Sequence, residues 1–200
     1  MILNNTTLHK NLKKIAEKQK EVGDILVFGS AVKGKERPED IDIIVIFKNR
    51  VVKETEYRIR KEIEKKYKSV SIISKASSAL FDPAFDARES ILFEGKSLLK
   101  DKTLAEQYGY NSVGMFKYHF KGWSKLKKTK YYHALNGRGA QKGIIEELAG
   151  IKLTDGVILV PLNKIELFRS FLEFWGLEYK YIPALIPERL NKKRILEQTF

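Results

Sequence analysis

Short apolar runs separated by polar segments dominate the first half of the chain. Runs of this kind, rich in Ile, Val and Phe, are typical of buried strands. They span residues 24–28, 40–47 and 69–74. Between the last two, residues 52–67 are highly charged, but Ile59 and Ile63 lie four residues apart, which predicts a surface helix with one buried face. Strands alternating with helices predict a small sheet flanked by helices.

The ends of this region predict two further elements. Thr6 or Thr7 can cap a helix that ends before Gly23. Near residue 95, the pair Glu94-Gly95 lies between the apolar stretch 91–93 and the short segment 96–98. We interpret that pair as a hairpin turn between two short strands.

The second half has its own pattern and predicts a separate domain. The boundaries expected from the sequence are 1–100 and 101–200. Residues 141–148 predict a helix and 157–160 a strand. A capping-box analogue, Asn163 with Glu166, opens a helix that ends at Gly176. The alternating apolar residues 177, 179 and 181 then predict another strand, which completes a strand–helix–strand unit.

Two short motifs carry the clearest chemistry. The first apolar run ends in Gly29-Ser30, and nine residues later Asp40 and Asp42 alternate with isoleucine at the start of the second run. Residues i and i+2 of a strand point to the same face, so the two carboxylates should project together. Mg²⁺ prefers oxygen ligands and is usually held by one or two carboxylates with substrate phosphates. Gly29 lets a phosphate approach the backbone, and Ser30 offers a hydroxyl and an N–H at the start of an expected short helix.

This pattern resembles the signature of the DNA polymerase beta-like nucleotidyltransferase superfamily, and in particular the minimal nucleotidyltransferases of archaea and bacteria. The resemblance covers roughly residues 5–100, and the later Ile91–Leu98 stretch is similar to the segment that closes the minimal domain. It implies an α/β (α+β) fold with a small mixed sheet and flanking helices, here followed by a second small basic α/β domain.

The resemblance also implies an activity: transfer of a nucleoside monophosphate from a nucleoside triphosphate to an acceptor hydroxyl, with Mg²⁺ or Mn²⁺ as cofactor. Asp40 and Asp42 would be the catalytic metal ligands, and Gly29 and Ser30 would hold the triphosphate. The superfamily usually supplies a third acid from a later strand, but here that position holds Ser71. Asp82, Asp86 and Glu89 could replace it, although we interpret them as solvated loop acids or caps.

Charge points to a polyanionic partner. The formal net charge is +13, divided as about +6 over residues 1–100 and +7 over the rest. Residues 111–142 contain no acid and interleave cations with aromatic residues, the mixture that a surface binding RNA or a single strand needs. The alternative is an aromatic core with a rim of solvated lysines. The nucleic-acid-binding candidates are Lys121, Trp123, Lys125, Lys127, Lys128, Lys130 and Arg138.

Composition limits the remaining possibilities. The chain has no cysteine, which excludes disulfides and thiolate metal sites. No apolar run is long enough to cross a membrane, so we expect a cytoplasmic protein, and the abundance of Lys and Glu fits a thermophile. The leading hypothesis is nucleotidyl transfer to an RNA or protein hydroxyl. Two alternatives are a non-catalytic nucleic-acid-binding protein that keeps the fold, and an antitoxin-like protein that modifies a partner.

Overall fold

The computed structural model describes residues 2–35 and 40–190, which divide into two compact units, Met1–Tyr108 and Gly109–Phe200. The boundary expected from the sequence lay eight residues earlier. Residues 104–107 form a short helix, α4 (Leu104–Gln107), and the amide of Gln107 donates a hydrogen bond (3.1 Å) to the buried carboxylate of Asp24. This bond ties α4 to the first unit.

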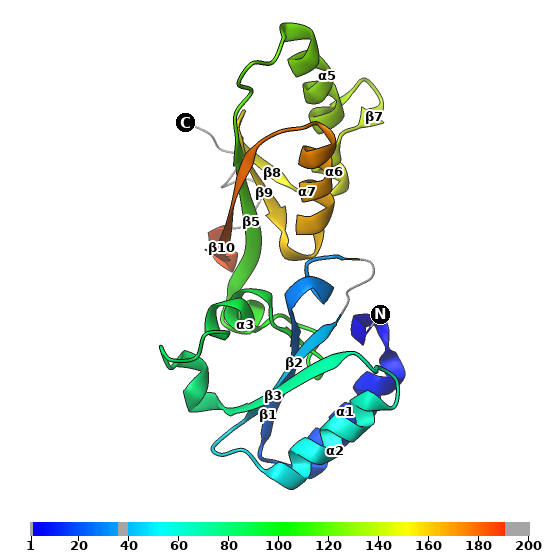
Figure 1. The fold of residues 1–200 in the computed structure, drawn as a ribbon, viewed down its shortest axis with the longest axis vertical. Helices are drawn as coiled ribbons and strands as arrows, with labels where there is room; N and C mark the ends of the chain where they lie inside the picture. The colour runs from blue at the N-terminus through cyan, green and yellow to red at the C-terminus, as the bar shows by residue number, and fades with distance from the viewer. Residues whose placement is uncertain (1, 36–39, 191–200) are drawn as a thin grey trace. The chain divides into compact units, whose positions relative to one another are not determined.

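The first unit is built on a mixed sheet of four strands in the order β3-β2-β1-β4 (Figure 1). Strands β1 (Val22–Phe28) and β2 (Ile41–Phe47) pair antiparallel, and β2 pairs parallel with β3 (Val70–Ala76). The short β4 (Lys96–Ser97) pairs antiparallel with β1. This mixed sheet with flanking helices confirms the expected fold class.

Helices cover both faces of this sheet because its central strands are apolar on both sides. Helices α1 (Thr6–Lys18) and α2 (Lys53–Glu64) lie side by side, with Leu8, Leu12, Ile59 and Ile63 buried (Figure 1). On the other face, Leu26 and Ile44 pack against Ile91 of helix α3 (Arg88–Glu94). The expected cap of α1 was wrong by one residue, since Asn5 accepts the hydrogen bond from the Leu8 N–H at 3.0 Å.

The expected hairpin at Glu94-Gly95 was also wrong. Residues 88–94 form helix α3, and only Lys96 and Ser97 on the far side of Gly95 form a strand. A short apolar run cannot by its own periodicity distinguish a strand from a buried helix. Here the helix is favoured because Ile91 fills the space against Leu26 and Ile44 on the open face of the sheet.

The second unit contains an antiparallel sheet in the order β10-β5-β9-β8. Its strands are β5 (Tyr110–Tyr118), β8 (Ile151–Thr154), β9 (Val157–Pro161) and β10 (Tyr179–Pro187). Helices α5 (Lys125–Asn136) and α7 (Ile165–Phe174) pack against it. The ring centroids of Phe116 on β5 and Phe168 on α7 are 5.1 Å apart. Strand β5, which carries Gly114 and Lys117 among its aromatic residues, was not predicted from the sequence.

Two local expectations in this unit are corrected. Residues 141–148 do not form one helix, because Gln141–Lys142 is strand β7, paired with β6 (Gly137–Arg138), and only Ile144–Glu147 is helical (α6). Asn163 does not cap α7, which begins at Ile165 after a 3₁₀ turn (Leu162–Lys164) and has no side-chain cap. Burial of Ile165 and Phe168 determines where this helix packs.

Candidate active site

Gly29 lies immediately after β1 and has a positive φ of 78°, a conformation that side-chain-bearing residues rarely adopt. A Cβ atom at this position would lie 2.9 Å from the Oδ2 atom of Asp42. Glycine is therefore required at position 29 for two reasons. It adopts the positive φ of the turn, and it leaves the space that the Asp42 carboxylate occupies. The helix expected to open at Ser30 is a single 3₁₀ turn, Gly29–Ala31, which is too short to provide the anion-favouring terminus of a helix.

Asp40 and Asp42 flank the first residue of β2. Asp40 is exposed and Asp42 is half-buried. In the sheet, Asp42 pairs with Phe28 of β1 on one side and with Ser71 of β3 on the other. Burial, the charge of Asp40 and the charge of Glu94 together raise the pKa of Asp42 above its ordinary value. The carboxylates of Asp40 and Glu94 thus each disfavour the charged form of Asp42.

Glu94, the last residue of α3, was not a candidate from the sequence. Its side chain is buried, its Oε2 atom accepts a hydrogen bond from the Gly29 N–H (2.9 Å), and its Oε1 atom pairs with Lys33 Nζ (2.9 Å). This bond engages the N–H of Gly29, the residue at which we had expected a phosphate to approach the backbone. The only sequence signal was a lone acid at the end of the apolar run 91–93, and the hairpin interpretation concealed it.

The residues present fit a divalent cation held partly by its substrate. Within residues 2–35 and 40–190 no group of three or more His, Cys, Asp or Glu side chains could hold a metal ion. Mg²⁺ needs only one or two protein carboxylates when phosphates and water complete its octahedron. Asp40 and Asp42 could supply that pair, and a cation would offset the burial and the neighbouring charges that raise the pKa of Asp42.

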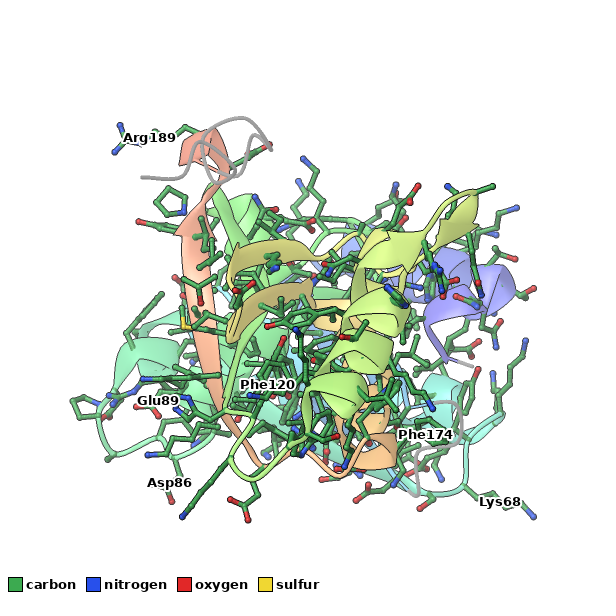
Figure 2. All side chains as sticks on the ribbon, turned by 90° about the horizontal axis from the view of Figure 1, so that it is seen from above. Lys68, Asp86, Glu89, Phe120, Phe174 and Arg189 are labelled. Atoms are coloured by element: carbon green, nitrogen blue, oxygen red, sulfur yellow. The ribbon has the colours of Figure 1, made fainter. Side chains whose placement is uncertain are left out.

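The acids considered as replacements for a third carboxylate have local partners or lie in solvent. The Oδ1 atom of Asp82 accepts a hydrogen bond from the Ala84 N–H (2.9 Å), as in an Asx turn. Glu89 forms an ion pair with its neighbour Arg88 (3.2 Å). Asp86 and Glu89 are exposed and point outward from the ribbon (Figure 2). These contacts favour the loop-acid interpretation.

The basic candidates of the second unit lie on α5 and on the segments beside it. Lys125, Lys127 and Lys130 of α5 are exposed, as are Lys121 before it and Arg138 on β6, whereas Lys128 is half-exposed. The ring of Trp123 is half-buried, 5.4 Å from Phe120 and 6.2 Å from Trp175 between centroids. Lys127 Nζ lies 3.9 Å from the centroid of this indole. Trp123 is thus part of an aromatic cluster, with a cation on its face.

A family model matches most of the first unit. Residues 10–102 match the family model described as "Polymerase beta, Nucleotidyltransferase", and this part of the chain is a nucleotidyltransferase domain of that family. One solved structure, a mutant of the toxin–antitoxin MntA-HpeT, is similar at 16% identity and a TM-score of 0.33. The alignment covers 45% of this chain and 70% of that chain. No curated protein matches the chain.

The same comparisons leave the second unit without a counterpart in the matched family model, which ends at residue 102. No helix in the described part of the chain is long and apolar enough to cross a membrane.

Proposed function

We propose that the protein transfers a nucleoside monophosphate from a nucleoside triphosphate to a hydroxyl of RNA or of a protein, with Mg²⁺ or Mn²⁺ bound at Asp40 and Asp42. The observation that carries this proposal is that two features meet at one end of the β1–β2 pair, inside a nucleotidyltransferase domain. They are the glycine turn after β1 and the Asp40/Asp42 pair at the start of β2.

In this proposal, each residue at this end of the β1–β2 pair has a separate role. Asp40 and Asp42 hold the metal, which when bound polarises the triphosphate and stabilises charge on the leaving pyrophosphate. Gly29 keeps the space beside Asp42 open. Glu94, paired with Lys33, holds the Gly29 turn by accepting a hydrogen bond from the Gly29 N–H. The Ser30 hydroxyl is left to bind a phosphate oxygen.

Activation of the acceptor hydroxyl is the weakest part of the site. Ser71 occupies the position beside Asp42 where a third carboxylate is expected, and a serine does not act as a carboxylate base. Glu94 is the other acid near Asp42, but both of its oxygens are engaged, one by Gly29 and one by Lys33. We therefore expect turnover to be slow.

The register of Asp42 with Ser71 also favours a second candidate function. A protein that keeps the metal pair but lacks the base would bind a nucleotide, or nucleic acid through its second unit, without transferring anything. In this case, the triphosphate would bind in an Mg²⁺-dependent way and remain intact.

A transfer assay distinguishes these functions. The protein is incubated with each of the four α-labelled ribonucleoside triphosphates, Mg²⁺ and either total RNA or a protein extract, beside the Asp40→Asn/Asp42→Asn variant. We expect label in an RNA or protein product that the variant does not form, and calorimetric Mg²⁺-dependent triphosphate binding that the variant loses. Binding without transfer would support the second candidate. Equal binding by wild type and variant would contradict both.

A further inference from the structure

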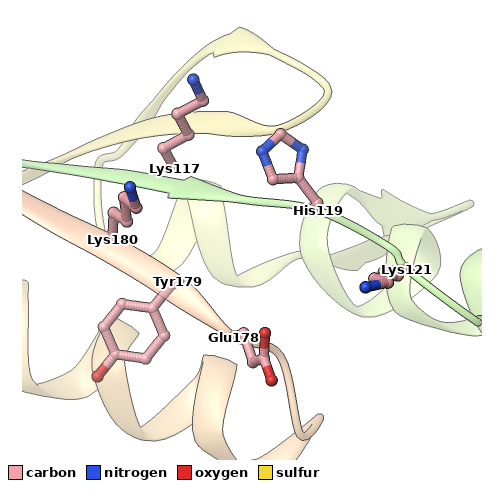
Figure 3. A pocket seen from close by; sticks show the side chains of 6 residues that line it. All are labelled: Lys117, His119, Lys121, Glu178, Tyr179 and Lys180. Atoms are coloured by element: carbon pink, nitrogen blue, oxygen red, sulfur yellow. The ribbon is translucent and has the colours of Figure 1, made fainter.

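A cavity of about 330 Å³ lies in the second unit, at the end of the sheet where β5 finishes and β10 begins (Figure 3). Its lining is strongly cationic. Three lysines and a histidine line it with one acid, which gives a formal charge of +2 when the histidine is neutral. The lining residues are Lys117, His119, Lys121, Glu178, Tyr179 and Lys180.

The fold brings two of these lysines to neighbouring positions on one face of the sheet. Lys117 of β5 and Lys180 of β10 are direct partners in the antiparallel pair, so their side chains leave the same face of the sheet. Like charges directly opposite each other destabilise a sheet. Among the described residues, neither lysine forms an ion pair or a hydrogen bond that would offset this repulsion. An arrangement that lowers the stability of the free protein is expected where an anion binds.

The tyrosine that lines the cavity is not free to stack on a base. The ring of Tyr179 packs on Phe116 (5.6 Å between centroids) and its hydroxyl donates to Glu173 (3.0 Å), so this ring is engaged on the helix side of the sheet. Lys121 lies on the segment that leads from β5 to α5 (Figure 3). Contacts from lysines to phosphates position a nucleic-acid chain without reading its sequence.

We propose that this pocket binds backbone phosphates of a nucleic acid strand, with Lys117 and Lys180 as its central pair and Lys121 at the side that leads to α5. A strand fits better than a free nucleotide because the acid-free segment 111–142 continues from the pocket into the lysines of α5, and because the Tyr179 ring of the lining is already packed on Phe116. This inference rests on the proposed function in one respect: the strand bound in the pocket is the RNA acceptor of the transfer reaction.

Binding of a fluorescent single-stranded RNA, measured by anisotropy at several salt concentrations without nucleotide or metal, tests this site. In Lys117→Gln/Lys180→Gln, we expect affinity to fall on the order of tenfold at 0.1 M salt. The log–log salt slope should fall by about 1.4, which corresponds to two phosphate contacts on a single strand. The matched control is Lys13→Gln/Lys14→Gln on α1, where both lysines are exposed and lie outside the pocket. The control should bind as wild type does.

Thermal unfolding without RNA provides an independent measurement. The double variant removes a like-charge pair, so it should melt at or above the wild-type temperature. If the two lysines only supported the fold, replacing them would lower the melting temperature. Glu178→Gln should tighten RNA binding, since it removes the one negative charge of the pocket. If the double variant melts below the wild-type temperature, the single variants Lys117→Gln and Lys180→Gln are measured instead. Each should lower the log–log salt slope by about half as much as the double variant is expected to.

Several results would overturn the proposal. One is that the pocket variant binds RNA with the wild-type affinity and salt slope. Another is that the α1 control loses as much RNA affinity as the pocket variant, which would indicate that net charge alone determines binding. If tripolyphosphate binds wild type but not the variant while RNA binds both equally, the pocket takes small phosphates. Poly-glutamate displacing RNA at equal charge would assign an acidic protein partner instead. Asp40→Asn/Asp42→Asn should keep RNA binding, so failure of the transfer reaction leaves this test unaffected.

Discussion

Ser71 lies directly opposite Asp42 in the parallel pair of β3 and β2. Neighbouring strands place such partners on the same face of the sheet, so the Ser71 hydroxyl and the Asp42 carboxylate face the same volume. A carboxylate at residue 71 would therefore complete an acidic cluster with Asp40 and Asp42. With serine, the proposed metal ligands Asp40 and Asp42 lack an acid at the position where the superfamily usually carries one.

This relationship predicts the effect of Ser71→Asp. A positioned general base contributes roughly 10²- to 10⁴-fold to a proton-transfer step, so the variant should raise the transfer rate by up to that factor if the chemical step limits turnover. The measurement is initial rate with labelled triphosphate at saturating Mg²⁺. The control is Ser71→Asn, which has nearly the same size but cannot take up the proton, and it should leave the rate unchanged. A faster Asn variant would show that shape, and not basicity, is responsible.

Gly29→Ala should damage both folding and nucleotide binding. The left-handed conformation costs an alanine about 1–2 kcal/mol, and its Cβ would also meet Asp42 Oδ2 at 2.9 Å. Gly109→Ala is the matched control, because Gly109 has the same φ of 78° but no atom within 4 Å of an added Cβ. Urea unfolding should give a larger loss of stability at residue 29 than at residue 109.

The same pair of variants separates binding from strain. Only Gly29→Ala should weaken Mg²⁺-dependent triphosphate binding, on the order of tenfold or more, because it displaces a proposed ligand oxygen. Equal effects of both alanines on binding would mean that the space beside Asp42 has no role.

Glu94→Ala should destabilise the protein by roughly 1–3 kcal/mol, because it leaves the Gly29 N–H without its partner and Lys33 without its ion pair. Glu94→Gln keeps an acceptor for the N–H and should cost less. Chemical denaturation measures the first effect. In the transfer assay, Glu94→Ala should raise KM for the triphosphate more than it lowers kcat if the turn positions the substrate. A pure loss of kcat would instead indicate that Glu94 acts in the chemical step.

Trp123→Ala distinguishes a base-stacking residue from a packing residue. Because the indole contacts Phe120 and Trp175 and carries Lys127 on its face, we expect mainly a loss of thermal stability, with a cost of up to roughly 3 kcal/mol for a half-buried ring. RNA affinity, measured well below the melting temperature, should change little. The control is Phe174→Ala, whose ring is 85% exposed and should contribute little to stability (Figure 2).

Glu62 gives a pH-dependent contribution to stability. Hydrogen bonds from Lys65 (2.6 Å) and then from Asn11 (2.6 Å) lower its pKa below the ordinary value of 4.5. A carboxylate with a lowered native pKa stabilises the fold fully above the unfolded pKa, and this contribution is lost as the pH falls through the native pKa. The difference in unfolding free energy between wild type and Glu62→Gln should therefore be largest above pH 4.5 and shrink in more acidic solution.

The matched control for that series is Glu64→Gln on the same helix. Glu64 is more exposed, with its ion pairs at 3.7 and 3.8 Å, so its replacement should have a small effect at every pH. A pH-independent difference for Glu62→Gln would contradict the assignment of its stabilising role to the charged form.

The sequence alone determined the local features of the first unit. The apolar runs of β1, β2 and β3 were readable because each is long, rich in β-branched residues and bounded by polar turns. The spacing of Gly29 and the two acids identified the candidate site, because both motifs lie at strand ends, where local pattern decides position. The surface helix α2 was readable from its charge and from the spacing of Ile59 and Ile63.

Only the tertiary structure decided which distant residues meet. Glu94 lies beside Gly29 because residues 88–94 pack as a helix on the sheet, and the short apolar run 91–93 does not reveal this choice by its own pattern. Likewise, Lys117 and Lys180 are 63 positions apart, and only the register of β5 with β10 brings their charges together. Register depends on how all the side chains of a face pack at once, and so no single segment of the sequence contains it.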